Sequence, residues 1–500
     1  MTKKFSVIFL ILAILSSLAV VTDVQAETPF NGIITSDATW TMANSPYTFQ
    51  GPVAVGRGVT LTIEAGVTIN VNSYYLQVNG TLTAKGTSDN KIVFTAASQD
   101  SNPQLKKAHL DFTASGSGSV LENVVLPDFI TIDGSVKLTQ CTIPEAQING
   151  GTPTLSGNSI NKLTLSGGSP TITNNDITGD FIQTRGTPTI NANTIHTKPW
   201  TRGGSPTFTG NKLYDGISAD SSGGQIVIAN NEISSTYYNA IFVKGRLEVV
   251  ISNNKITGNS NGDGIYVSGI LSSVTITQNQ ISGCNSGIHL DMTTAQVTKN
   301  TLTNNNIGLY LVLGPAMAGA SGEFAKISSA NVQYNTISQN SIGLQITPYE
   351  GSSIINNNIQ DNSQYDLKLQ SANDLTIANN YWGTTDTAAV AQKIFDNKND
   401  FNVGYVTVTP VLTSPVPQYS PDLNAPIPTF SPVFTPTPTS TQPADSSAPL
   451  PTQNTTQEPT HPPNGISFNL SPGDTAILAI VIIIVVVSLT VVIIALRRKR

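Results

Sequence analysis

An Asn-x-Ile/Leu signature returns about once every twenty residues through most of this chain. The intervals run from 17 to 25 residues, apart from one of 35 that contains an insertion at 314–330. A period in this range is typical of a solenoid, in which each repeat buries its apolar side against its neighbours. The insertion is rich in small residues and is expected to leave its coil as a loop. The signature begins at Asn158, Asn175, Asn193, Asn211, Asn231, Asn254, Asn279, Asn300, Asn335 and Asn357, and it ends as Asn380-Tyr381-Trp382.

Each repeat also contains short runs in which apolar and polar residues alternate. In one repeat Val274-Thr275-Ile276-Thr277 precedes Asn279, and Gly287-Ile288-His289-Leu290 follows it. This alternation indicates strands, and four-residue strands between Asn, Gly and Ser clusters leave no room for a helix. Asn at the corner tolerates left-handed backbone angles, and amides stacked in register are expected to form a hydrogen-bonded ladder. Three strands per coil of about 22 residues predict an all-β fold, a right-handed parallel β-helix with capped ends.

The two ends of the chain predict its placement at a cell surface. Lys3 and Lys4 precede an uncharged apolar run, and small residues near Ala26 suit cleavage, so residues 1–26 are interpreted as a secretory signal peptide. A transmembrane helix is predicted at 475–496, where 21 uncharged residues are long enough to cross a hydrocarbon core of ~30 Å. The basic tail 497–500 follows at once. Since positive charge beside a span stays cytoplasmic, we expect a single-pass protein of the cell membrane whose N-terminal part is extracellular.

The chain between these ends divides by composition. Residues 27–120 are expected to hold the N-terminal cap and first coils, and residues 121–412 the remaining coils and a C-terminal cap. Residues 413–474 are rich in Pro, Thr and Ser, a composition that favours extended polyproline II and is typical of a stalk or a plain linker. Asn79, Asn454 and Asn469 stand in Asn-x-Ser/Thr sequons and are candidate glycosylation sites.

Charge and cysteine content narrow the classes of partner. Without the signal peptide and the basic tail, the chain has 19 basic and 30 acidic side chains, which disfavours nucleic acid as a partner. Cys141 and Cys284 stand about seven repeats apart, roughly 30 Å at the spacing of stacked strands, so no disulfide is expected. The four histidines are widely spaced, and neither a metal site nor a cofactor is predicted beyond weak calcium binding near turns. The oligomeric state stays open.

The repeats resemble the right-handed β-helix proteins of the pectin-lyase-like superfamily, specifically membrane-anchored surface proteins of archaea and some bacteria. The resemblance covers roughly residues 31–410. Residues 40–94, which include Leu76-Gln77-Val78-Asn79-Gly80-Thr81-Leu82, are similar to the N-terminal coils of such proteins, and residues 380–386 resemble their closing motif. A helix from 387 to 396, with Thr385 or Thr387 as its N-cap, is expected to cover the open end of the stack.

The resemblance does not bring a catalytic site with it. The superfamily includes polysaccharide lyases and glycoside hydrolases, and its hydrolases place Asp-Asp and Gly-His-Gly on adjacent coils. Neither motif occurs in this sequence. The clustered Asp residues and basic side chain of the related lyases are missing as well. The resemblance therefore favours a protein without enzymatic activity, and any activity would be that of a polysaccharide lyase or glycoside hydrolase.

The best candidate surface comes from aligning the strands that follow the signature. The side chain after the Ile or Leu of each strand points outward, so stacking puts Phe242, Tyr266, His289, Tyr310, Gln345 and Lys368 in one column. The first four are predicted ligand-binding residues, because aromatic rings stack on the apolar faces of sugars. Asp263, His289 and Asp291 lie close by and are the candidates for acid/base chemistry. The alternative is that the aromatic rings stack on one another for stability alone.

Three functions follow from these observations. The favoured hypothesis is a surface-anchored rod without enzymatic activity, which binds polysaccharide or cell-envelope glycans or partners on neighbouring cells. The second is a polysaccharide-active enzyme with a site near Asp263, His289 and Asp291. The third is a purely structural component of the envelope. Exposure of the aromatic column to solvent separates the first from the third.

Overall fold

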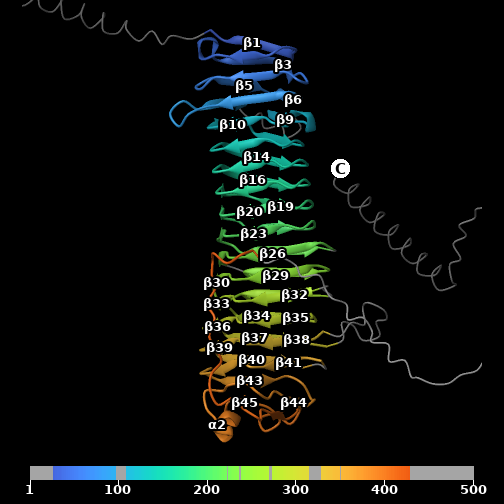
Figure 1. Cartoon of the computed structure of the whole chain (residues 1–500), viewed down its shortest axis with the longest axis vertical. Coiled ribbons are helices and arrows are strands. Elements are labelled where there is room, and N and C mark those ends of the chain that lie inside the picture. Colours follow the sequence, from blue (N-terminus) through green and yellow to red (C-terminus); the bar gives the residue numbers. More distant parts are fainter. Residues whose placement is uncertain are drawn as a thin grey trace, which may run out of the picture. The chain divides into compact units, whose positions relative to one another are not determined.

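The computed structural model describes residues 26–96, 108–221, 223–235, 238–269, 273–314, 328–348 and 351–427. In these residues short strands pair in parallel with the strands one coil before and one coil after, and the coils stack along one axis (Figure 1). Most coils contribute three strands, one to each of three faces. The fold is therefore the parallel β-helix that the repeats predict.

The first face is a sheet of 15 strands. Its strands are β2 (Ala38–Trp40), β4 (Thr60–Ile63), β7 (Thr81–Lys85), β10 (Val120–Glu122), β13 (Lys137–Thr139), β15 (Thr154–Ser156), β17 (Thr171–Thr173), β20 (Thr189–Asn191), β23 (Thr207–Thr209), β26 (Gln225–Ala229), β29 (Glu248–Ser252), β32 (Ser273–Thr277), β35 (Ala295–Thr298), β38 (Ala330–Gln333) and β41 (Ser353–Ile355).

The second and third faces join into one sheet of 29 strands, because four long strands turn the corner between them. Those four are β1 (Thr28–Ile34), β3 (Tyr47–Val55), β14 (Thr142–Ile148) and β16 (Ser159–Leu165). The second face continues with β5 (Thr68–Asn72), β8 (Ile92–Ala96), β11 (Val124–Val125), β18 (Asp176–Ile177), β21 (Thr194–Ile195), β24 (Lys212–Leu213), β27 (Glu232–Ser234), β30 (Lys255–Thr257), β33 (Gln280–Ser282), β36 (Thr301–Thr303), β39 (Thr336–Ser338) and β42 (Asn358–Gln360).

The third face carries the candidate site. Its strands are β6 (Tyr75–Val78), β9 (His109–Phe112), β12 (Phe129–Ile132), β19 (Phe181–Gln183), β22 (Trp200–Thr201), β25 (Ile217–Ser221), β28 (Ile241–Gly245), β31 (Ile265–Ser268), β34 (Ser286–Asp291), β37 (Ile307–Val312), β40 (Ile342–Thr347), β43 (Tyr365–Leu369) and β45 (Ile394–Phe395). Two 3-10 turns, η1 (Met42–Asn44) and η2 (Ala114–Gly116), and a separate pair, β44 (Leu375–Thr376) with β46 (Val406–Thr407), complete the described strands and turns outside the C-terminal cap.

The signature asparagines form the predicted ladder, at the corner between the first and second faces. The Nδ2 of each one donates to the Oδ1 of the next at 2.9–3.0 Å, from Asn158 to Asn380. The amide also reaches a carbonyl of an earlier coil, as in Asn279 Nδ2 to Ile251 O at 3.0 Å. Because every one of these side chains is at most 2 % exposed and hydrogen-bonded, the ladder satisfies the polar groups of a buried corner.

The left-handed backbone does not belong to the ladder residues themselves, and this part of the prediction is wrong. The residue immediately before has the positive φ, as at Asn174 (54°), Asn253 (54°) and Asn356 (57°). A ladder asparagine keeps its amide directed inward, and the residue before it makes the turn. Two adjacent residues thus share the roles that the sequence assigned to one.

A second, shorter ladder stands at the corner between the second and third faces. Asn305 donates to Asn340, which donates to Asn362, and Asn362 donates to Asp366 Oδ1 at 2.8 Å. A cysteine precedes the first asparagine of each ladder and donates its backbone N–H to it. Cys141 N donates to Asn158 Oδ1, and Cys284 N donates to Asn305 Oδ1. Both cysteines are free and buried, as their separation predicts, and burial raises the pKa of Cys141 to about 11 and of Cys284 to about 12.

The C-terminal cap differs from the prediction in its bounds. The helix α2 (Thr387–Gln392) has Asp386 as its N-cap, whose Oδ1 accepts from Ala388 N at 2.9 Å, so the prediction of Thr385 or Thr387 is wrong. The helix is also shorter than the predicted 387–396, because Ile394–Phe395 leave it to pair as β45 with β43. Val390 and Ile394 are buried in the core, so the cap covers the end of the stack as expected.

Residues 411–427 turn back from the cap and run along the side of the stack (Figure 1). Asn358 holds Val416 through two hydrogen bonds of 2.9 Å, and Thr301 Oγ1 donates to Tyr419 O at 2.7 Å. Farther along, Asn230 Nδ2 donates to Ala425 O at 2.7 Å. The first part of the predicted stalk 413–474 is therefore a strap held by the coils. The sequence-based boundary missed it because the contacts join residues up to 195 positions apart.

Several predictions fall outside the described residues. These are most of the signal peptide 1–26, the stalk beyond residue 427, the span 475–496, the tail 497–500, Asn454 and Asn469, and most of the loop 314–330. In the part of the chain that the structure describes, no helix combines the length and the apolar character needed to cross a membrane.

Candidate binding face

One outward-facing row of side chains runs the length of the third face. The register confirms the predicted column, because Phe242 pairs with Tyr266, Tyr266 with His289 and His289 with Tyr310. The same register extends it in both directions. We call it the outer row: Gln77, Asp111, Thr131, Gln147, Thr164, Ile182, Trp200, Ser218, Phe242, Tyr266, His289, Tyr310, Gln345, Lys368 and Phe395.

The four predicted aromatic residues form a continuous stack. Phe242 and Tyr266 are parallel with ring centres 5.6 Å apart, and His289 and Tyr310 lie at 4.4 Å. Tyr266 meets His289 edge to face at 4.8 Å. The rings of this stack are half-buried, and they form two face-to-face pairs, Phe242 with Tyr266 and His289 with Tyr310. Within each pair the facing sides of the rings are covered, and the outer faces of Phe242 and Tyr310 lie at the two ends of the stack.

Asp263 and His289, from neighbouring coils, are brought into direct contact. His289 Nδ1 lies 2.9 Å from Asp263 Oδ2, and Ser286 N donates to Asp263 Oδ1 at 3.0 Å. Burial raises the pKa of the Asp263 carboxyl, but the hydrogen bonds from His289 and Ser286 outweigh it and hold that pKa below its usual value. Since an ionised carboxylate only accepts hydrogen bonds, His289 Nδ1 carries the proton, which leaves Nε2 as the basic nitrogen.

The third acid/base candidate, Asp291, has a different partner. Its Oδ2 accepts a hydrogen bond of 3.2 Å from the Tyr266 hydroxyl. Burial raises the pKa of Tyr266, and the Asp291 carboxylate adds to this rise. Asp263 and Asp291 therefore act on the two neighbouring inner rings of the stack: Asp263 orients His289 and Asp291 orients Tyr266.

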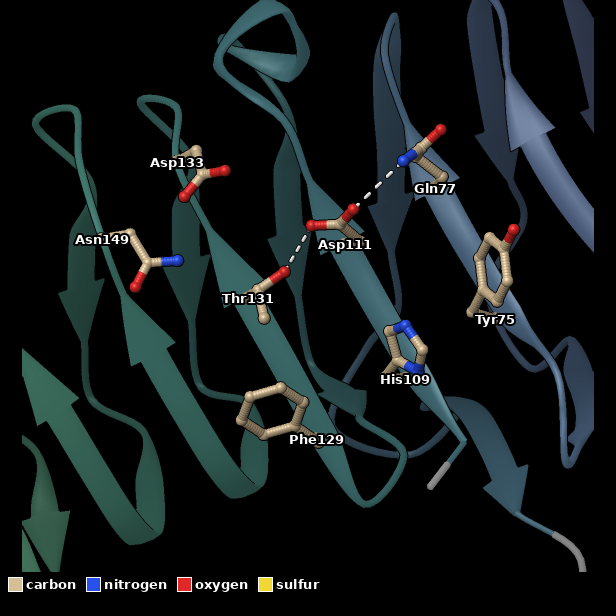
Figure 2. Close-up of a pocket in the computed structure, with 8 residues that line it drawn as sticks. All are labelled: Tyr75, Gln77, His109, Asp111, Phe129, Thr131, Asp133 and Asn149. Carbon is tan, nitrogen blue, oxygen red and sulfur yellow. Dashed lines mark hydrogen bonds between the residues drawn. The ribbon is translucent and has the colours of Figure 1, made fainter. Parts of the chain in front are cut away.

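A hollow of about 540 Å³ lies farther toward the N-terminus of the same face, and sequence reasoning missed it. Figure 2 shows three rings along one side of it, Tyr75, His109 and Phe129, from three successive strands. Tyr75 and His109 are stacked with centres 5.2 Å apart. The alternation of outward aromatic residues with inward Leu76, Leu110 and Ile130 in β6, β9 and β12 was the available signal. The coils here precede the asparagine signature, so they were not aligned.

The floor of this hollow is a hydrogen-bonded set of polar side chains. Gln77 Nε2 donates to Asp111 Oδ2 at 3.2 Å, and Thr131 Oγ1 donates to Asp111 Oδ1 (Figure 2). The exposed side chains of Asp133 and Asn149 line the opposite side from the rings. Acceptors and donors thus stand beside an aromatic wall, which is the composition of a site for a hydroxyl-rich ligand.

A second hollow, of about 400 Å³, lies between the first hollow and the aromatic stack. It is lined by Trp200, Thr201, Arg202, Ser218, Asp220 and Phe242. Trp200 is 50 % exposed, and the Arg202 guanidinium lies over its ring, with Cζ 5.1 Å from the ring centre. The third face therefore has two hollows and a stack, all on the outer row or next to it.

Two other predictions concern metal binding and the sequon at Asn79. No group of three or more His, Cys, Asp or Glu side chains within the described ranges is arranged to hold a metal ion. Asn79 is half-buried beside the first hollow, where its Nδ2 donates to Gln77 Oε1 at 3.2 Å and its Oδ1 accepts from Thr113 Oγ1 at 3.2 Å. Glycosylation at Asn79 stays a prediction, as do the binding roles of Phe242, Tyr266, His289 and Tyr310.

Comparison with known proteins assigns the family. The family described as the right handed beta helix region matches residues 129–316 and 215–381, and the pectate-lyase like beta helix domain matches residues 32–105. The chain belongs to the right-handed parallel β-helix proteins. No match emerges from the curated proteins. These matches agree with the resemblance to pectin-lyase-like repeats, and they carry no assignment of a ligand.

Proposed function

We propose that this β-helix binds polysaccharide or cell-envelope glycans along its third face, without cleaving them, as the extracellular part of a membrane-anchored surface protein. The observation that carries the proposal is the hollow of Figure 2, where the Tyr75, His109 and Phe129 rings face the Asp111 hydrogen-bond network. Aromatic rings pack against the apolar faces of sugars, and carboxylate and amide groups bond to their hydroxyls. The apolar run 476–496 and the basic tail support the anchoring.

A glycan array probed with the full-length chain tests this proposal. The chain is kept soluble in a zwitterionic detergent that contains no sugar, and neutral and acidic polysaccharides are presented with and without calcium. Phe129→Ala removes one ring of the aromatic wall and is expected to lower retention at least tenfold. Tyr74→Ala is the matched control, because Tyr74 is a partly exposed aromatic residue on a neighbouring turn and does not line the hollow. Equal binding by both variants, or no binding by the unmodified chain, contradicts the proposal.

A second candidate function is polysaccharide cleavage, and the Asp263–His289 contact is what favours it. A histidine oriented by an ionised carboxylate is a competent proton acceptor. The imidazole is 18 % exposed, but it is enclosed between Tyr266 and Tyr310, which limits access of a glycosidic bond. A reducing-sugar assay on the same polysaccharides decides between the two. Product release that His289→Gln abolishes, with binding retained, establishes cleavage and overturns the non-enzymatic proposal.

A further inference from the structure

The aromatic stack of the third face ends at Phe242, and the place next to it is almost empty. Tyr266 covers one face of the Phe242 ring, with centres 5.6 Å apart and planes 15° from parallel. In the other direction the outer row continues with Ser218, and then with Trp200. A small side chain therefore stands between two large flat ones.

The spacing of this gap suits one ring. Neighbouring parallel strands lie ~4.8 Å apart, so the Trp200 and Phe242 positions are separated by roughly 9.6 Å, two strand spacings. Where the row is filled, ring centres follow each other at 4.4 to 5.6 Å. One guest ring between Trp200 and Phe242 would continue the stack at the same interval. The hollow of about 400 Å³ lined by these residues lies within the usual range of ~300–1,000 Å³ for small-ligand sites.

The walls and the rim of the gap indicate the chemistry of the guest. The Phe242 ring bounds the gap on one side and Trp200 bounds it on the other, with the Arg202 guanidinium over the Trp200 ring. The rim is polar, because exposed Arg202 and Asp220 stand beside the row with a hydrogen-bond donor and an acceptor. The guest should thus have two apolar faces and polar groups around its edge.

A pyranose whose ring hydroxyls are all equatorial has this form. Its axial C–H bonds make both faces apolar, and its hydroxyls project in the ring plane, toward the rim. The axial hydroxyl of a galacto- or manno-configured sugar points instead at one of the flat walls, where it would be buried without a partner. The gap therefore discriminates by the configuration of the sugar.

We propose that Trp200, Ser218 and Phe242 form a slot for a single gluco-configured pyranose residue, with Arg202 and Asp220 bonding to its hydroxyls. The slot rests on the proposed function in that its ligand is a sugar, and it adds which sugar and where. The guest ring lies across the axis of the coils, so its glycosidic links leave toward solvent or along the strands.

Ligand-observed NMR on the full-length chain, in the sugar-free zwitterionic detergent, tests the slot with two probes. Methyl β-D-glucopyranoside is expected to show saturable binding, and methyl β-D-galactopyranoside binding at least threefold weaker. Ser218→Tyr places a ring in the gap and is expected to weaken binding of the glucoside at least tenfold, whereas the control Tyr74→Ala, at a residue that lines neither hollow, leaves the affinity within twofold. Trp200→Ala removes one side of the gap and leaves it open. It is also expected to lower the affinity for the glucoside at least tenfold, so the test does not depend on one variant folding.

The outcomes separate the slot from the wider proposal. Equal affinity for the two probes, or a glucoside affinity unchanged by Ser218→Tyr and Trp200→Ala, overturns the slot. If in that case polysaccharide retention still falls in Phe129→Ala, the glycan-binding face stands without the slot. Absence of binding to every polysaccharide and to both methyl glycosides overturns both proposals.

Discussion

The asparagine ladder and the outer row repeat side chains along the same axis at the same spacing, but they are built differently. The ladder uses one residue type at every coil from Asn158 to Asn380, and each member is buried and fully hydrogen-bonded. The outer row changes from coil to coil, most of its members are half-buried, and its large flat side chains are interrupted at Ser218. Uniform repetition marks a position that stabilises the stack. Variation at equivalent positions marks a surface on which ligand specificity can be built.

The largest expected effect is on the ladder. Asn279→Ala removes the amide that donates to Asn300, Ile251 and Thr277 and accepts from Asn254, so several buried polar groups lose their partner. At ~1–3 kcal/mol for each buried group left unsatisfied, we expect the free energy of unfolding to fall by at least about 2 kcal/mol. Denaturant unfolding of the full-length chain measures it. The adjacent Gln280→Ala, at an exposed position, is the control and should change little.

A smaller effect is expected from the outer row. Tyr266→Ala interrupts the aromatic stack and Tyr310→Ala shortens it, and a ring pair contributes about 0.5–1.5 kcal/mol beyond its buried area. We expect each variant to lose clearly less stability than Asn279→Ala does in the same assay. A loss as large as that of the ladder variant would show that the outer row is a structural element of equal weight. The distinction between a stabilising ladder and a variable outer row would then be contradicted.

The smallest effect concerns Asp366, which ends the second ladder in place of an asparagine. Burial raises the pKa of its carboxyl, and the hydrogen bonds from Asn362 and the Lys393 charge offset only part of this rise. A carboxyl whose pKa is raised in the folded state stabilises the protein at low pH. That contribution is lost as the pH rises from the pKa of the unfolded state, ~3.9, through the pKa of the folded state. Asp366→Asn keeps the acceptor oxygen without the charge. Its advantage in unfolding midpoint over the unmodified chain should therefore grow between about pH 4 and pH 7, and a constant difference would contradict this assignment.

The sequence predicted the fold well because the ladder is a local, periodic signal. One motif repeated within the chain, Asn-x-Ile/Leu, sets the corner and the register, and hence the column from Phe242 to Lys368. What it did not predict depends on contacts between distant residues or on coils without the signature. The strap at 411–427 is held by Asn358, Thr301 and Asn230, far away in the chain. The hollow around Phe129 lies in coils that precede the first signature asparagine.

The site was predicted only in part for a related reason. Register placed Tyr266 beside His289, but whether rings face solvent or one another depends on side-chain angles that a pattern does not determine. The structure shows Phe242 facing Tyr266 and His289 facing Tyr310, whereas Tyr266 meets His289 edge to face. Free ring faces thus occur where the repetition stops, at Phe242 beside Ser218, and such a break is visible only after the upstream coils are aligned with the rest.

The central claim is that the third face binds glycans while the ladder holds the fold, and affinity electrophoresis with matched unfolding curves tests it most directly. The full-length chain and a Phe129→Ala/Trp200→Ala double variant are run in native gels that contain each polysaccharide. The account predicts retardation of the unmodified chain by at least one polysaccharide and free migration of the double variant, with unfolding midpoints that nearly coincide. Equal migration of the two proteins in every gel would contradict it.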